Sequence, residues 1–184
     1  MASPSESAAT DLLALAVTRP ATLGPGRLVC VDGPAGAGKT TLAGELAELA
    51  PEATVVHTDD LIEGWEGLPG LAAAVSALLA PLADGGVGRW RRWDWVASAW
   101  AETCEVSPGG LLVLEGVGSW SPSIAPWVTA LAWVEAAYDV RMARGLERDG
   151  EAFAPHWDQW ARDEAELFAR TGARDVADLV VVTG

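Results

Sequence analysis

Lysine is nearly missing from this sequence: Lys39 is the one lysine among 12 basic residues, against 26 acidic ones. The formal net charge of −14 leaves no broad basic face for a phosphate backbone or an anionic bilayer. We therefore expect neither a nucleic-acid partner nor a membrane partner. A polyanionic ligand would have to meet positive charge locally. A genome that favours arginine codons would also produce few lysines, so rarity alone assigns Lys39 no role.

Cysteine and long apolar runs are scarce as well. Cys30 lies within an apolar run and Cys104 is isolated, so no C-x-x-C pair indicates a metal or redox site. The first 21 residues contain no basic segment, and no apolar run there approaches the ~20 residues that a membrane-spanning helix needs. We expect a cytoplasmic protein with reduced cysteines, and neither secretion nor anchoring.

What the sequence does contain predicts one compact domain. It has 184 residues, half of them hydrophobic, and no internal repeat or low-complexity linker. We predict a single domain over 1–184, with a leading helix and loop in 1–26. The sequence has ten tryptophans, most of which cluster in 90–95, 119–133 and 157–160. We expect them in the core or in the wall of a cleft, because an indole ring buries a large area and needs one polar partner.

Short apolar runs typical of buried strands alternate with segments of helical periodicity. The predicted strands cover 27–32, 53–60, 110–116, 130–136 and 178–184, and the predicted helices cover 7–18, 39–49, 68–82, 138–149 and 155–170. This alternation predicts a three-layer α/β fold with a five-stranded parallel sheet and helices on both faces. Such sheets bind ligands at the carboxyl ends of their strands.

The strongest motif follows the first predicted strand. Residues 33–40, GPAGAGKT, match G-x-x-x-x-G-K-[ST] with a strand before and a helix after. Glycines let backbone N–H groups converge on phosphates, Lys39 neutralises the β and γ phosphates, and Thr40 supplies a hydroxyl to Mg²⁺. The predicted nucleotide contacts are Gly33, Ala35, Gly36, Ala37, Gly38, Lys39, Thr40 and Thr41.

A glycine-rich turn that binds nothing would not need both the lysine and the hydroxyl. A lysine also suits this position, because a compact charge on a flexible stem reaches between phosphates where the broad fork of arginine fits poorly. The chain has no N/T-K-x-D segment that would read guanine, so ATP is the default nucleotide.

Acidic residues follow two further predicted strands. Asp59 and Asp60 stand at the carboxyl end of the second predicted strand, and Glu115 stands at the carboxyl end of the third. We therefore expect all three near the phosphate loop. Phosphoryl transfer needs carboxylates to hold Mg²⁺ and to take the proton of the acceptor hydroxyl. The alternatives are an aspartate that caps the next segment and a solvated glutamate. His57 is expected to be packed or hydrogen-bonded rather than catalytic.

Six segments in order resemble the uridine kinase family of P-loop nucleoside and nucleotide kinases. They are VDGPAGAGKTTLA, VVHTDD, RRWDWV, LLVLEG, VRMARGLERD and ADLVVVTG, and the resemblance covers residues 27–184. It implies the P-loop fold with strand order 2-3-1-4-5 and a short lid over about 145–160.

The resemblance also implies roles at the phosphates. Asp59 corresponds to the base that activates the acceptor hydroxyl and, with Thr40 and Glu115, organises Mg²⁺. Arg144 and Arg148 join Lys39 in clamping the transferring phosphoryl group.

On the acceptor side the resemblance implies Asp60, Trp93, Asp94 and Arg141. The spacing of Arg141, Arg144 and Arg148 places them on one helical face, as a shared target would require. An exposed basic face paired with neighbouring acids is the alternative for this helix.

One departure concerns the acceptor. Where uridine kinases carry a histidine that reads the pyrimidine, this chain has Val96, Ala97, Ser98 and Ala99, which argues against uridine itself. The sequence thus predicts an ATP- and Mg²⁺-dependent kinase of a hydroxyl on a small molecule, with a nucleoside as the first candidate acceptor. A sugar, an antibiotic or a nucleotide as acceptor, and a nucleotide-binding regulatory protein with little catalysis, are the alternatives.

Overall fold

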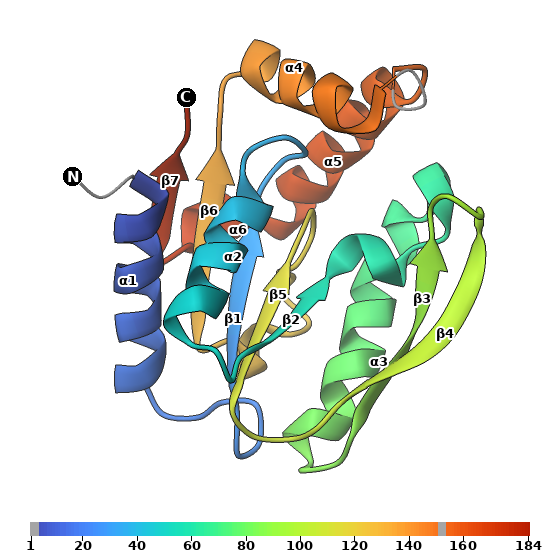
Figure 1. Ribbon diagram of the computed structural model, residues 1–184. Coiled ribbons are helices and arrows are strands. Elements are labelled where there is room, and N and C mark those ends of the chain that lie inside the picture. Colours follow the sequence, from blue (N-terminus) through green and yellow to red (C-terminus); the bar gives the residue numbers. More distant parts are fainter. Residues whose placement is uncertain (1–3, 151–153) are drawn as a thin grey trace.

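Five parallel strands form the central sheet of the computed structural model, which describes residues 4–150 and 154–184 (Figure 1). The strands are β1 (Arg27–Asp32), β2 (Thr54–His57), β5 (Leu111–Glu115), β6 (Ala130–Glu135) and β7 (Leu179–Val182). Their spatial order, β2-β5-β1-β6-β7, is the order 2-3-1-4-5 of the five predicted strands. Every pairing is parallel, so the predicted fold class and strand order are confirmed.

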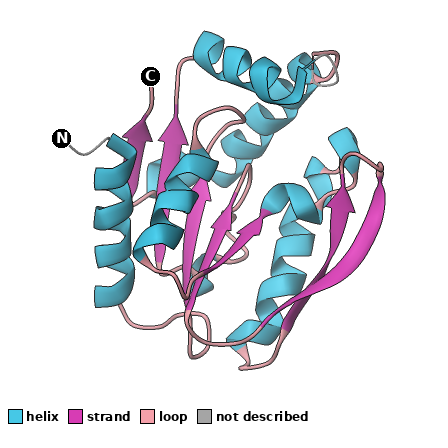
Figure 2. Cartoon of the chain, viewed as in Figure 1, coloured by secondary structure: helices cyan, strands magenta, loops and turns pink. Residues whose placement is uncertain are grey.

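Helices cover both faces of this sheet (Figure 2). The helices of the chain are α1 (Pro4–Thr18), α2 (Lys39–Leu49), α3 (Leu71–Ala83), α4 (Tyr138–Asp149), α5 (Trp157–Thr171) and α6 (Ala173–Val176). Of these, α4 lies beyond the carboxyl ends of the strands rather than on a face (Figure 1). Alternate residues of a strand point to opposite faces, and β1 shows the result. Leu28 and Cys30 pack in one core with α3 and α5, whereas Val29 and Val31 pack in a second core with α1 and α2.

A two-stranded antiparallel hairpin stands apart from the central sheet. Strand β3 (Gly88–Asp94) pairs with β4 (Ala99–Val106), and β3 packs against α3 and the 3-10 helix η1 (Thr58–Leu61). The sequence analysis did not predict these strands. The register shifts between Arg91 and Trp93, which breaks the alternation of polar and apolar residues that would have revealed a strand.

Several element boundaries differ from those predicted. The second strand ends at His57 rather than at residue 60, because the chain turns at once into η1. The third helix begins at Leu71, after a separate 3-10 turn over Leu68–Gly70. The short helix α6 was not predicted. Over residues 4–150 and 154–184, the structure contains no helix with the length and apolar character needed to cross a membrane.

Candidate functional site

The phosphate loop, residues 33–40, connects the buried strand β1 to α2. Gly33, Gly36 and Gly38 have φ angles of 141°, 75° and 100°, which residues with a Cβ atom rarely adopt. At Gly33 a Cβ would also overlap the carbonyl oxygen of Val134 on β6. The glycines of the motif are therefore required by the backbone path itself.

Lys39 begins α2 and folds back over this loop. Its Nζ donates a hydrogen bond to the carbonyl oxygen of Pro34 at 2.9 Å, and the residue is 7% exposed. Burial lowers the pKa of the ammonium, although Glu115 and Asp59 nearby favour its charged form. The single lysine of the chain therefore lies at the centre of the loop, within reach of two carboxylates.

Glu115 lies where the carboxyl ends of three strands meet. It is the last residue of β5 and is in register with His57 of β2 and Val31 of β1. Its Oε1 accepts a hydrogen bond from the hydroxyl of Thr40 at 3.2 Å and lies 2.5 Å from His57 Nδ1. Burial disfavours the ionised carboxyl, but the bond to His57 and the charge of Lys39 outweigh it and lower the pKa of Glu115. The bond to Glu115 in turn raises the pKa of His57.

The second oxygen of Glu115 makes this a candidate Mg²⁺ site. Oε2 is buried and has no hydrogen-bond partner. Such an oxygen needs a donor or a cation, and it sits on the carboxylate that already contacts Thr40. Among the described residues no three His, Cys, Asp or Glu side chains cluster as metal ligands. Mg²⁺ in phosphoryl-transfer sites needs no such cluster, because it keeps waters and phosphate oxygens beside one or two carboxylates and a hydroxyl. The residues present fit the ion.

Asp59 and Asp60 lie on η1, directly after β2, but in different surroundings. Asp59 lines the cleft described below, and burial raises the pKa of its carboxyl against the opposing charge of Lys39. Asp60 is not among the residues that line the cleft. Burial raises its pKa too, and the charges of His57 and Arg92 oppose the shift. The structure therefore brings the predicted base, and not its neighbour, to the phosphate loop.

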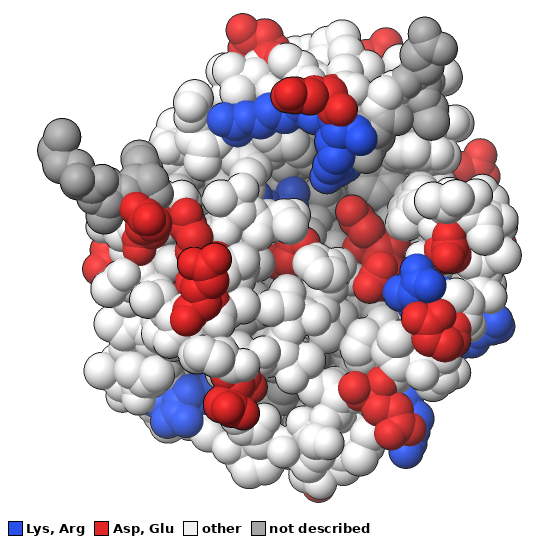
Figure 3. Space-filling model, in the orientation of Figure 1, with Lys and Arg blue, Asp and Glu red and all other residues white. Residues whose placement is uncertain are grey.

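A cleft of about 1180 Å³ opens over the carboxyl ends of the strands. Its polar lining includes Lys39, Thr40, Thr41, Asp59, Glu115, Arg144 and Arg148, and its aromatic lining includes Trp65, Trp93, Trp95, His156 and Trp160. Figure 3 shows basic side chains along one edge of the hollow, over α4, and acidic side chains facing them. The cleft thus has a charged half beside the phosphate loop and an aromatic half beside the hairpin.

The three predicted arginines of α4 take different positions. Arg148 lines the cleft and lies near enough to Asp59 to oppose the rise in its pKa. Arg144 also lines the cleft, and its Nη1 donates to the hydroxyl of Thr183 at 2.9 Å. Arg141 is not part of the lining, because its guanidinium is engaged by Glu164. The position of Arg141 therefore favours a role in holding the phosphate loop, rather than the predicted role of contacting the substrate.

The predicted lid over 145–160 can be described only at its two ends. It begins within the last turn of α4 and ends in the first turn of α5, while residues 151–153 lie outside the described part of the chain. Gly145, Arg148, His156 and Trp160, from the described ends, line the cleft.

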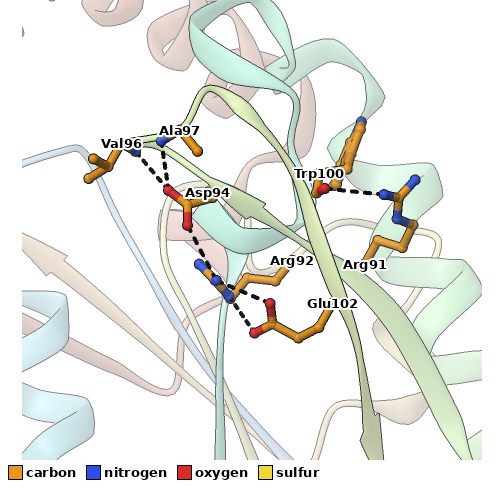
Figure 4. Close-up of polar contacts among 7 residues, drawn as sticks. All are labelled: Arg91, Arg92, Asp94, Val96, Ala97, Trp100 and Glu102. Carbon is orange, nitrogen blue, oxygen red and sulfur yellow. Dashed lines mark hydrogen bonds and ion pairs between the residues drawn. The ribbon is translucent and has the colours of Figure 1, made fainter.

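The hairpin supplies part of the aromatic lining of the cleft. Trp93 and Trp95 line the cleft, and Trp95 Nε1 donates to the backbone carbonyl oxygen of Asp59 at 3.2 Å. Asp94, predicted to contact substrate, is used in the turn instead. Its Oδ1 accepts from the backbone N–H groups of Val96 and Ala97 at 3.0 and 2.8 Å (Figure 4).

Arg92 completes the local structure of this turn. Its Nη2 lies 3.5 Å from Asp94 Oδ2, and its Nε lies 2.8 Å from Oε1 of Glu102 on β4 (Figure 4). The bonds from Ala97 and Val96 hold the pKa of the Asp94 carboxyl below its usual value, and the charge of Arg92 adds to this effect. Asp94 and Arg92 therefore form the scaffold of the hairpin, and neither is among the residues that line the cleft.

Sequence reasoning missed several residues at the site. Trp65 stacks on His156 with ring centroids 4.8 Å apart and packs edge-on against Trp95 and Trp160. Glu164 of α5 accepts a hydrogen bond from the backbone N–H of Ala35 in the phosphate loop. The clustering of tryptophans indicated a cleft wall in general terms. No local pattern marks His156 or Glu164, because their partners lie far away in the sequence.

Comparisons with known proteins agree with this architecture. No protein-family profile and no curated protein sequence matches the chain. Among solved structures, a Bacillus stearothermophilus protein described as a possible uridine kinase aligns with a TM-score of 0.65 at 18% identity, over 95% of this chain and 98% of that one. A Silicibacter sp. TM1040 protein described as a putative fructose transport system kinase aligns with a TM-score of 0.63 at 20% identity, over 96% of this chain and 98% of that one.

A third solved structure extends the comparison to another acceptor. D-glycerate 3-kinase from Cryptococcus neoformans var. grubii aligns with a TM-score of 0.57 at 11% identity, over 94% of this chain and 89% of that one. At these identities the likeness concerns the fold. The chain shares the α/β fold of these three structures.

Proposed function

We propose that this protein is a kinase that transfers the γ-phosphoryl group of ATP to a hydroxyl of a small acceptor. The observation that carries the proposal is the meeting of Lys39, Thr40, Asp59 and Glu115 in one cleft, with an aromatic wall opposite. A phosphate loop alone would indicate nucleotide binding. A partly buried carboxylate beside it, facing a second and apolar half of the cleft, is the additional feature that a phosphotransferase needs.

Each side chain has a distinct role in the proposed reaction. Asp59 takes the proton of the acceptor hydroxyl, whose oxygen attacks the γ-phosphorus as the bond to ADP breaks. Burial, which raises the pKa of Asp59, makes it a better base than an exposed aspartate. Lys39, Arg144 and Arg148 offset the negative charge of the transferring group.

Thr40 and Glu115 would hold Mg²⁺, with Asp59 as the third predicted ligand. When bound, the ion neutralises charge on the β and γ phosphates. Glu115 is prepared for this role, because its carboxyl is held ionised and one of its oxygens has no other partner. His57 orients the same carboxylate from β2.

The acceptor half of the cleft is suited to a molecule with an apolar or planar face. Trp65, Trp93, Trp95 and Trp160 present ring surfaces there, and the hairpin tip adds Val96 and Ser98. A nucleoside is the first candidate, in line with the resemblance to uridine kinases. A sugar, an antibiotic or a nucleotide remains the alternative, because Ser98 lies in the segment where a pyrimidine-reading histidine was expected.

The test measures ADP release with ATP and Mg²⁺ over a panel of nucleosides, sugars and aminoglycosides. At least one acceptor should raise ADP release above the rate with ATP alone. Asp59→Asn should reduce that acceptor-dependent rate by roughly a hundredfold or more while ATP still binds, because a positioned general base contributes about 10²–10⁴-fold. Asp84→Asn is the matched control, because Asp84 is an exposed aspartate at the end of α3 and lies outside the cleft lining.

Nucleotide binding is tested separately by thermal shift. ATP with Mg²⁺ should raise the melting temperature of the wild type and not that of Lys39→Ala. Equal shifts would remove Lys39 from the phosphate site. A clear ATP shift with no active acceptor would favour the alternative, a nucleotide-binding regulatory protein with little catalysis.

A further inference from the structure

Glu164 reaches the phosphate loop from α5. The residue is 3% exposed, and its Oε2 accepts a hydrogen bond from the backbone N–H of Ala35 at 2.8 Å. Its Oε1 accepts from Arg141 Nη1 of α4, also at 2.8 Å. The same Nη1 donates to the carbonyl oxygen of Ala35 at 3.1 Å. One residue of the loop is therefore held at both its N–H and its C=O by a buried ion pair.

The position of Arg141 is itself fixed by aromatic residues. Its guanidinium lies over the rings of Tyr138 and Trp157, 5.6 and 5.9 Å from their centroids, and its side chain is 12% exposed. Trp157 Nε1 donates to the hydroxyl of Tyr138 at 2.7 Å, which joins α5 to α4. A cation packed between rings and a carboxylate in this way has little freedom to turn toward another ligand.

The outer turn of the loop, residues 35–37, also packs against α4 directly. A Cβ at Gly36 would overlap the backbone carbonyl oxygen of Arg141, and the φ of Gly36 is 75°. On the far side of the turn, the hydroxyl of Thr183 donates to the carbonyl oxygen of Ala37 at 2.7 Å. Figure 1 shows the loop between β1 and α2 below α4 and beside α5.

We propose that Glu164 is a positioning residue for nucleotide binding, which acts with Arg141 to hold the outer turn of the phosphate loop in the conformation that receives phosphates. The proposal rests on the function proposed above. Free loops of this kind lose conformational entropy when their N–H groups converge on a ligand, and a clamp that fixes them beforehand removes that loss from the binding step. Glu164 is placed for this task, because it contacts the loop backbone and has a fixed counter-ion.

The ion pair between Glu164 and Arg141 predicts that a second substitution can partly restore the ATP affinity lost by the first. A carboxylate beside a site for a polyanion is tolerable only while its charge is neutralised. Arg141→Met would leave Glu164 ionised or unpaired next to the bound phosphates. Removing Glu164 as well should then restore part of the lost affinity. A residue that merely filled space would not produce this rescue.

The experiment measures the dissociation constants of ATP, ADP and AMP, each with Mg²⁺, by isothermal titration calorimetry. Glu164→Ala should weaken ATP binding by about tenfold, and Arg141→Met by more, with a larger loss for ATP than for AMP. The double variant Arg141→Met/Glu164→Gln should bind ATP more tightly than Arg141→Met alone. Glu166→Gln, an exposed glutamate two positions along the same helix, should match the wild type.

Hydrogen exchange reports on the loop itself and needs no nucleotide. The amide of Ala35 should exchange faster in Glu164→Ala than in the wild type, while the amide of Ala50, which is bonded to Leu46 at the far end of α2, should not change. Glu164→Gln keeps an acceptor for Ala35 and should show an intermediate rate. This milder variant keeps the test usable if Glu164→Ala does not fold.

The outcomes separate this proposal from the previous one. Unchanged ATP affinity in every variant, with unchanged exchange at Ala35, would overturn the clamp while leaving the kinase intact. Uniform losses for ATP, ADP and AMP without rescue in the double variant would also overturn it, because they indicate general destabilisation. If the wild type does not bind ATP, the proposed function fails, and exchange at Ala35 still decides whether Glu164 holds the loop.

Discussion

Asp32 is the most deeply buried acid next to the phosphate loop, and no step of the proposed reaction uses it. Its carboxylate is 0% exposed and accepts hydrogen bonds from the backbone N–H groups of Gly33, Gly118 and Trp120 at 2.7, 2.8 and 3.0 Å. These bonds join the end of β1 to the segment after β5. Burial outweighs the bonds and raises the pKa of Asp32 to about 6.

This pKa predicts a contribution to stability that depends on pH. The folded state holds the proton of Asp32 up to about pH 6, whereas the unfolded chain releases it near the ordinary aspartate pKa of 3.8. Between these values the folded state binds more protons, so this residue lowers the free energy of unfolding as the pH rises, by roughly 3 kcal/mol in all. Above about pH 6 its contribution should no longer change.

Urea unfolding of the wild type and of Asp32→Asn between pH 4 and 7 measures this contribution. The difference in unfolding free energy between the two proteins should change across the window and become constant above it. Asp11→Asn, an exposed aspartate of α1, is the matched control and should leave the pH profile unchanged. A difference that does not vary with pH would show that Asp32 is ionised throughout.

Residues within a contiguous motif could be predicted, and residues that meet across the fold could not. Lys39 and Thr40 follow from a local pattern whose backbone geometry needs only the neighbouring glycines. Glu164 contacts Ala35 across 129 positions, and no local periodicity records such a contact. Asp94 is a case in which the structure adds a role that the local pattern does not show. Its place between two tryptophans indicated a substrate contact, whereas the hairpin turn that uses its carboxylate is visible only in the structure.

At the scale of elements, the β3–β4 hairpin connects the aromatic wall to the proposed base. Trp95 Nε1 donates to the carbonyl oxygen of Asp59 at 3.2 Å, so the position of η1 depends in part on the hairpin. Trp95→Phe keeps an aromatic ring and removes this bond, which should be worth about 1 kcal/mol. We expect kcat/KM for the acceptor to fall about fivefold, with little change in ATP affinity.

The matched control is Trp100→Phe on β4. The ring of Trp100 packs edge-on against that of Trp93, with centroids 5.2 Å apart, and Trp100 is not part of the cleft lining. Steady-state kinetics at saturating ATP, together with ATP titration, distinguish the two variants. An equal loss in both would point to the fold of the hairpin rather than to the bond with Asp59.

The five strands of the central sheet could be predicted because each contains a short apolar run. This run is almost fully buried in β1, β5 and β6, whereas the edge strands β2 and β7 are partly exposed. The hairpin could not be predicted, for two physical reasons. Three arginines fall among its tryptophans, and the bulge between Arg91 and Trp93 shifts the pattern by one residue. Its stability comes from packing on α3 and η1, contacts that the local sequence does not reveal.

Charge is the dominant property of the whole molecule. With a formal net charge of −14, the folded chain concentrates like charges that the unfolded chain spreads apart. Added salt shortens the Debye length from ~20 Å at 20 mM to ~6 Å at 300 mM and screens this repulsion. The melting temperature should therefore rise by several degrees between these NaCl concentrations, measured at pH 7.5 with a chelator present. A fall would mean that the screened ion pairs contribute more than the repulsion.

The separation of the hairpin from the central sheet has a consequence for how such a protein can diverge. In the part of the chain that the structure describes, β3 and β4 pair only with each other, so insertions or substitutions there leave the register of the parallel strands unchanged. Sequence change in the hairpin could therefore remodel the aromatic side of the cleft while the five parallel strands and the phosphate loop stay in place. The bond from Trp95 to Asp59 limits this freedom, because it ties the hairpin to η1.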